Sequence, residues 1–119
     1  MANKFLINCQ HGIDDLEKAT VAMIVAGAAA AMDGETAVFM TGDSVRLATA
    51  GGTDGLQLEK YPEIGELVES FLENGGQLWV CPVCAGARDI GADDLIEGAE
   101  IAGAARTIGF VNDGAQLLM

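Results

Sequence analysis

The chain has 119 residues, of which 18 are acidic and 6 are basic, and its formal net charge is −12. This length suits one core, so we expect a single domain over residues 1–119. The acidic balance argues against nucleic acid and against anionic membrane surfaces as partners, because binding phosphates needs clusters of Lys and Arg. The longest apolar stretch, 21–32, is too short to span a bilayer.

The first predicted strand covers residues 5–9, a short and nearly continuous apolar run. No signal-peptide pattern precedes it, and the three cysteines are therefore interpreted as free thiols or ligands rather than as a disulfide scaffold. We expect the protein to reside in the reducing cytoplasm. Asp14 or Asp15 is predicted to cap a helix that runs to about Met32 and is stopped by Asp33-Gly34.

The middle of the chain predicts a second strand and two helical segments. Residues 36–40 form the strand, and a short helical segment follows over 44–49. The Gly-rich stretch 50–55 is expected to be a mobile surface loop, because it contains no phosphate-loop Lys and little that would pack. Pro62 is predicted to open the next helix, which Gly75-Gly76 ends.

The last third of the chain begins with a predicted third strand at 78–80, which runs directly into a helix at Pro82. One helical turn is expected at 93–97. The remaining predicted elements are a short strand at 99–102, a helix over 104–111 and a last strand at 115–119.

Strands that alternate with helices and are apolar on both faces predict an α/β fold with a parallel sheet covered on both sides. In such sheets the chemistry takes place outside the carboxyl ends of the strands. The side chains predicted to follow strands at this edge are those of Cys9, His11, Met40, Thr41, Cys81 and Cys84.

The Cys81-Pro82-Val83-Cys84 motif carries the clearest chemical signal. Pro82 suits the first position of a helix, which places Cys81 at its N-cap and Cys84 in its first turn. The positive end of the helix dipole stabilises a thiolate there and lowers its pKa. Arg88 is expected to add positive charge on the same side. The plainer interpretation is that both cysteines are small, buried, unreactive residues.

Three segments, 39–47, 78–84 and 94–104, together resemble the DsrE/DsrF-like family, which includes the TusD and YchN types. The resemblance extends from the first predicted strand to the last. It implies a three-layer α/β/α domain with a five-stranded parallel sheet. It also implies assembly into trimers or hexamers, alone or with related subunits.

The best-understood members of this family are sulfur carriers. In these, a Cys after the third strand accepts a persulfide sulfur from one protein and passes it to another. The resemblance maps this role onto Cys81 and places Arg88 where the carriers have a basic residue. The chain differs from them at Asp89, where the carriers often have Gly, and at Cys84, which the TusD type lacks.

From this resemblance and the thiol chemistry we expect persulfide relay or thiol-redox transfer through Cys81, with donor and acceptor proteins as partners and no cofactor. Cys81 would attack the outer sulfur of a donor persulfide. Cys84 would then either resolve the new persulfide and release sulfide, or stay reduced and tune the pKa of Cys81. Whether such a sulfurtransferase-like carrier counts as an enzyme stays open.

Zinc binding is the sharpest alternative. Cys9-x-His11 and Cys81-x-x-Cys84 together hold every Cys and the single His of the chain, and Cys₃His is a structural zinc set. Against it, Cys-x-His is a poor ligand spacing, and the family's strand order puts another strand between the two pairs. Otherwise Cys9 is interpreted as a core residue, and His11 as a loop residue or a proton donor near Cys81.

Two further alternatives concern the fold and the assembly. Cys-x-x-Cys after a strand also occurs in thioredoxin-like oxidoreductases, but here the motif comes late, and no Pro precedes a late strand. A non-enzymatic binding or assembly subunit is the other possibility, because many Gly and Ala residues and few aromatics suit tight subunit packing.

Overall fold

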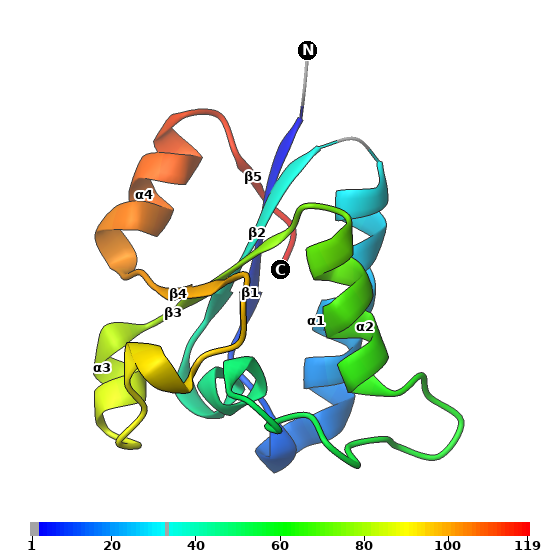
Figure 1. Cartoon of the computed structure of the whole chain (residues 1–119). Helices are drawn as coiled ribbons and strands as arrows, with labels where there is room; N and C mark the ends of the chain where they lie inside the picture. Colours follow the sequence, from blue (N-terminus) through cyan, green and yellow to red (C-terminus); the bar gives the residue numbers. More distant parts are fainter. Residues whose placement is uncertain (1–2, 33) are drawn as a thin grey trace.

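The computed structural model describes residues 3–32 and 34–119, which contain a five-stranded, all-parallel sheet with the strand order β4-β3-β2-β1-β5 (Figure 1). The strands are β1 (Lys4–Cys9), β2 (Glu35–Met40), β3 (Gln77–Val80), β4 (Ala99–Ile101) and β5 (Gln116–Leu117). The predicted α/β class with a five-stranded parallel sheet is confirmed.

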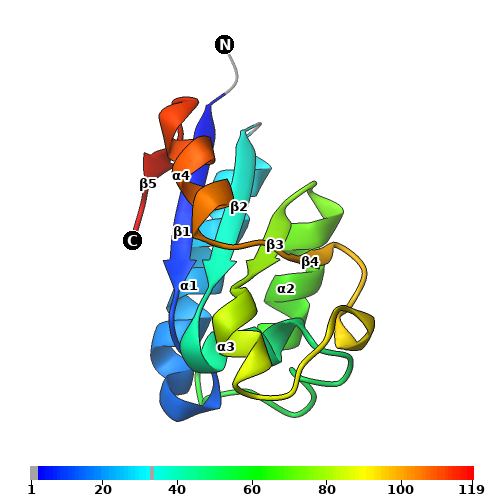
Figure 2. The ribbon, with the colours of Figure 1, turned by 90° about the vertical axis from the view of Figure 1, so that its left-hand side faces the viewer.

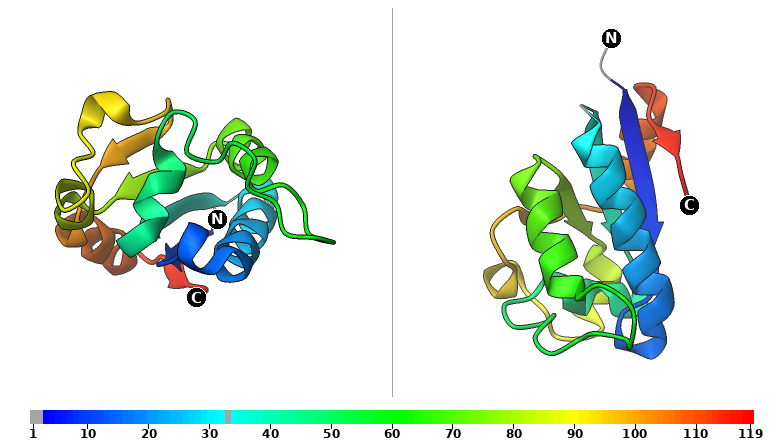
Figure 3. Two further views of the ribbon diagram at one scale, coloured as in Figure 1. Left: turned by 90° about the horizontal axis from the view of Figure 1, so that it is seen from below. Right: turned by 90° about the vertical axis from the view of Figure 1, so that its right-hand side faces the viewer.

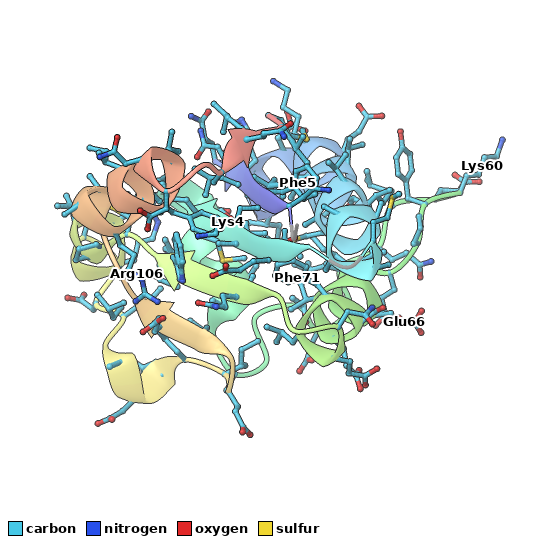
Figure 4. The ribbon with its side chains drawn as sticks, turned by 90° about the horizontal axis from the view of Figure 1, so that it is seen from above. Lys4, Phe5, Lys60, Glu66, Phe71 and Arg106 are labelled. Carbon is cyan, nitrogen blue, oxygen red and sulfur yellow. The ribbon has the colours of Figure 1, made fainter. Side chains whose placement is uncertain are left out.

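Helices lie on both faces of the sheet. On one face lie α1 (Leu16–Ala31) and α2 (Ile64–Glu73), and on the other lies α4 (Ala104–Asn112) (Figures 1 and 2). The α1/α2 face holds the larger core, in which Phe71 is fully buried and points toward the sheet, whereas Glu66 on the same helix is exposed and points outward (Figure 4). A helix that buries one stripe and solvates the other is held to its sheet by that stripe.

The α4 face has a smaller core, which includes the aromatic rings of Trp79 and Phe110. Trp79 meets Phe110 of α4 edge to face, with ring centroids 5.1 Å apart. The Arg106 guanidinium lies 4.8 Å from the centre of the Trp79 ring and forms a 3.0 Å ion pair with Glu100 (Figure 4). The carboxyl halves of β1 and β2 remain uncovered on this face, beside α3 (Pro82–Gly86) (Figure 2).

The strand ends are level with one another. Cys9 pairs with Met40, and Met40 pairs with Val80. Beyond these pairs the ladder continues by one bond each, because Thr41 N–H donates to Cys9 C=O and Cys81 N–H donates to Met40 C=O, both at 3.0 Å. Residues that follow β1, β2 and β3 therefore meet at one edge of the sheet.

The predicted starts of α1 and α3 hold, whereas that of α2 does not. A 3₁₀ turn (Ile13–Asp15) leads into α1, and the Asp15 carboxylate caps it by accepting from Lys18 N–H at 3.2 Å. The stop predicted at Asp33-Gly34 falls partly on residue 33, which lies outside the described residues. The predicted start of the next helix at Pro62 was two residues early, since Glu63 keeps an extended backbone (φ −68°, ψ 127°) and is the N-cap.

The Gly-rich stretch after the second strand consists of successive tight turns rather than an extended loop. It follows a 3₁₀ helix (Gly42–Ala48), where the helical segment was predicted. A side chain cannot replace the hydrogen of Gly52, because a Cβ there would lie 1.9 Å from Arg46 C=O. Farther along, Tyr61 donates a hydrogen bond to Glu17 of α1. Glycine here permits close packing of the chain on itself.

The C-terminal third matches the predicted order. A 3₁₀ turn (Ala92–Asp94) occupies the start of the predicted helical turn, and both β4 and α4 form as expected. Strand β5 is shorter than predicted. The chain beyond it stays against β1, because Leu118 N–H donates to Leu6 C=O at 2.9 Å and Asn8 N–H donates to Met119 C=O at 3.0 Å. Within residues 3–32 and 34–119, no helix is long and apolar enough to cross a membrane.

Candidate active site

The Cys-Pro-x-Cys motif lies at the carboxyl edge of the sheet. Strand β3 ends at Val80 and α3 begins at Pro82, so a single residue, Cys81, joins them. Cys81 has extended backbone angles (φ −60°, ψ 123°) and is the N-cap, and its C=O accepts the first helical bond from Ala85 N–H at 2.9 Å. Pro82 fits because the first helical position has no N–H partner to lose.

The Cys81 thiol is half-buried, and its surroundings favour the thiolate. Burial alone opposes ionisation. The neighbouring backbone N–H and thiol of Cys84 and the backbone N–H of Val83 outweigh that burial and lower the pKa of Cys81. The arrangement places two thiols within a single helical turn, with Cys81 at the N-cap and Cys84 in the first turn.

The Arg88 side chain contacts the backbone of the second cysteine. Helix α3 ends at Gly86, and the guanidinium Nη1 of Arg88 donates to Cys84 C=O at 3.1 Å. The Arg88 N–H has turned to Ala85 C=O, so the carbonyl of Cys84 lacks its usual helical donor. The side chain supplies that missing bond. Arg88 therefore holds the backbone of the second thiol, and it is the Val83 and Cys84 groups that lower the pKa of Cys81.

Asp89 explains why α3 is so short. Its φ of 57° is left-handed, its N–H bonds to Gly86 C=O at 3.2 Å, and the N–H of Ile90 reaches back to Ala85 C=O at 2.9 Å. These two bonds form a Schellman motif, in which the left-handed residue is usually Gly. The sulfur carriers that the sequence resembles often have Gly at this position, and Asp is among the few other residues that tolerate it.

Cys9 and His11 belong to a different part of the edge. Cys9 is 2% exposed, its thiol donates weakly to His11 C=O at 3.5 Å, and burial raises its pKa. The His11 ring pairs with Asp14 through Nδ1 and Oδ2 at 3.1 Å. Gly12 N–H and, after it, His11 lower the pKa of Asp14. His11 is thus engaged with its own loop rather than with Cys81.

The zinc alternative does not fit this arrangement. Strand β2 separates β1, which carries Cys9, from β3, which leads to Cys81 and Cys84. Among residues 3–32 and 34–119, no group of three or more His, Cys, Asp or Glu side chains is placed to hold a metal ion. The four residues considered as zinc ligands, Cys9, His11, Cys81 and Cys84, do not come together in one site.

Two features near Cys81 escaped the sequence analysis. One is the pair of backbone N–H groups of Val83 and Cys84, which the Cys-Pro-x-Cys spacing itself implies. The other is Gly103, the N-cap of α4, where an added Cβ would lie 3.3 Å from the Pro82 ring. Nothing local in the sequence marks this contact, because it joins residues 21 positions apart.

Solved structures with a similar fold were found. The YchN protein of E. coli superposes with a TM-score of 0.79 at 16% identity, over 99% of this chain and 100% of that one. A protein of unknown function from Methanobacterium thermoautotrophicum gives a TM-score of 0.75 at 15% identity, over 98% and 97%. At such identities the likeness concerns the fold. The fold is therefore that of these structures, and the thioredoxin-like fold considered from the sequence is not the one found.

Sequence comparison also finds relatives. An uncharacterized protein of Methanocaldococcus jannaschii is 32% identical over 91% of this chain, which spans only 39% of that relative's length. An uncharacterized protein of Methanopyrus kandleri is 33% identical over 72% of this chain and 68% of its own length. The model of the DsrE/DsrF-like family matches residues 3–119. The chain therefore belongs to the DsrE/DsrF-like family.

Proposed function

We propose that the protein acts in sulfur relay or thiol-redox transfer, with Cys81 as the reactive thiol and Cys84 as its partner. One observation carries the proposal. Cys81 is the half-buried N-cap residue of a helix that starts directly after β3, and the neighbouring groups of Cys84 and Val83 lower its pKa. Membership of the DsrE/DsrF-like family, whose best-understood members carry persulfide sulfur, supports the same role.

The transfer step needs no oxidant or cofactor. The Cys81 thiolate attacks the outer sulfur of a donor persulfide, so that a new S–S bond forms on Cys81 and the donor leaves as a thiolate. An acceptor thiolate then takes the outer sulfur in the same manner and regenerates the Cys81 thiolate. In the redox variant, the deprotonated Cys84 attacks the inner sulfur instead, which yields a Cys81–Cys84 disulfide and releases hydrosulfide.

Partners and location are part of the proposal. Donor and acceptor proteins are required by the chemistry, and self-assembly into trimers or hexamers, with or without related subunits, is supported by apolar side chains on the α4 and β5 side. Ile108 is 66% exposed, Val111 46% and Leu117 63%. Three free cysteines suit a reducing cytoplasm.

A non-enzymatic assembly subunit is the second candidate, and the same exposed apolar side chains favour it. In that case the cysteine pair would be structural. The two candidates differ in a measurable property, because a structural Cys81 would neither accept sulfur nor ionise below the ordinary thiol pKa.

The test is intact-protein mass spectrometry after incubation with a cysteine desulfurase and cysteine. Wild type should gain the mass of sulfur, Cys81→Ser should not, and Cys84→Ser should retain the adduct for longer than wild type because the resolving thiol is absent. Equal labelling of the two single variants would refute the assignment to Cys81. An unlabelled wild type, also with a second persulfide donor, would favour the assembly candidate.

A further inference from the structure

Gly103 borders the Cys81 site at a place where one added carbon atom has too little room. The starts of α3 and α4 lie next to one another, on the side of the molecule away from α1 and α2 (Figures 2 and 3). A Cβ on Gly103 would lie 3.3 Å from both Cγ and Cδ of Pro82, the residue that directly follows Cys81. This distance is shorter than the optimum for two carbon atoms, so a side chain here would push the two helix starts apart.

The backbone of Gly103 does not itself require glycine. Its angles, φ −102° and ψ −159°, lie in the extended region that every L residue adopts. Gly103 is also the N-cap of α4, where Ser, Thr, Asp and Asn are favoured because their side chains accept hydrogen bonds from the first turn. Glycine has no side chain to make that bond. The close approach of Pro82 is therefore the feature that calls for glycine at this position.

Gly103 is held firmly on its own side of the contact. The residue before it, Ala102, continues the sheet by donating its N–H to Val80 C=O at 3.0 Å. The carbonyl of Gly103 accepts from Arg106 N–H at 3.1 Å, which fixes it to the first turn of α4. Pro82 is exposed to solvent, so it is the partner that can give way.

A displacement of Pro82 would reach the thiol, because a proline ring cannot rotate away from a contact. The ring is fused to the backbone, so pushing it moves the Cys81–Pro82 peptide and the first turn of α3. That turn holds the backbone N–H and thiol of Cys84 and the backbone N–H of Val83, which outweigh burial and lower the pKa of Cys81. The setting of the sulfur therefore depends on where Pro82 lies.

We propose that Gly103 is a positioning residue for Cys81: by leaving room for the Pro82 ring it sets where α3 starts, and it thereby holds the sulfur in its reactive setting. Gly103 acts through Pro82. The inference rests on the proposed function, in which Cys81 is the reactive thiol. It gives α4, which follows the edge strand β4, a part in the reactivity of a thiol that follows β3.

The test is the pH profile of Cys81 alkylation by iodoacetamide in the full chain, read by peptide mass mapping. Gly103→Ala should raise the midpoint of this profile by about 0.5 pH unit, which slows alkylation at neutral pH about threefold. Gly109→Ala is the matched control, because it makes the same change in the same helix where the added Cβ has open space of 4 Å among the described residues. Its midpoint should equal that of wild type.

Pro82→Ala supplies the second test, because it removes the Cγ and Cδ atoms that Gly103 faces. In that background Gly103→Ala should no longer shift the midpoint, as expected for two residues that act through one contact. If Gly103→Ala alone is too unstable for the alkylation measurement, the double variant should regain the lost free energy of unfolding in urea denaturation.

A wild-type midpoint in Gly103→Ala would overturn the inference, and so would a shift of the same size in Gly109→Ala. It is also overturned if the effect of Gly103→Ala, on the midpoint or on stability, persists undiminished in the Pro82→Ala background. These outcomes leave the proposed function standing. The proposed function fails instead if wild-type Cys81 takes up no sulfur in the desulfurase experiment, and an ordinary thiol midpoint in wild type would overturn both.

Discussion

Cys9 and Cys81 stand at the carboxyl ends of two strands in one sheet, yet their environments are opposite. Cys9 is the last residue of β1, faces the α1/α2 core and has a pKa raised by burial. Cys81 is the first residue after β3 and has a pKa lowered by the turn that follows. The strand end alone therefore does not activate a thiol. What decides is whether the chain starts a helix at the next residue, as Pro82 makes it do.

The largest expected difference between these two thiols is in their reactivity. With iodoacetamide at neutral pH, Cys81 should be alkylated about a hundredfold faster than Cys9, because Cys9 reacts only when the core opens locally. Peptide mass mapping over time measures both rates in one sample. Alkylation of Cys9 at a rate similar to that of Cys81 would show that the core around β1 is open in solution.

Substitution should lower the free energy of unfolding more at Cys9 than at Cys81, which is the reverse of their order in reactivity. Cys9→Ser places a hydroxyl in an apolar core and should lower the free energy of unfolding by about 1–3 kcal/mol. Cys81→Ser, at a half-buried N-cap where Ser is a favoured residue, should change it by less than about 0.5 kcal/mol. Urea denaturation of both variants beside wild type provides the comparison, and a larger loss for Cys81→Ser would contradict it.

The two thiols should also respond oppositely to pH. Because the folded pKa of Cys81 is lowered, its thiolate contributes stability that is present above the unfolded thiol pKa of about 8.5 and is lost as pH falls through the folded pKa. Cys9 has a raised folded pKa, so its contribution is present below that unfolded pKa and is lost as pH rises.

Cys84→Ala removes the Cys84 thiol, which helps to lower the pKa of Cys81, and should shift the alkylation midpoint of Cys81 upward. An unchanged midpoint would assign the effect to the backbone N–H groups alone.

The smallest effect is expected at Arg88. Arg88→Met removes the bond to Cys84 C=O and should cost about 1 kcal/mol in unfolding free energy. The alkylation midpoint of Cys81 should stay where it is, because the guanidinium acts on the carbonyl of the neighbouring thiol. Arg88→Lys, which keeps the charge, is the control. A midpoint that rises in Arg88→Met and returns in Arg88→Lys would restore the electrostatic role expected from the sequence.

The features that could be predicted from the sequence are those that depend on residues close together in the chain. The strands are apolar runs, and the positions of Cys81 and Pro82 follow from their own spacing, so these were predicted. The start of α2 depends on the extended backbone of Glu63, and the pairing of His11 with Asp14 depends on the loop path, so neither had a local signal. The bond from Arg88 to Cys84 C=O had no local signal either, because it depends on α3 ending at the left-handed Asp89.

The aromatic cluster on the α4 face has a practical consequence. Trp79 is the single tryptophan of the chain, lies two residues before Cys81 and is 3% exposed against Phe110 and Arg106. Its fluorescence therefore arises from one known environment on the strand that carries the reactive sulfur. Any event that moves the end of β3, whether disulfide formation, sulfur loading or docking of another subunit, has a built-in optical reporter that requires no label.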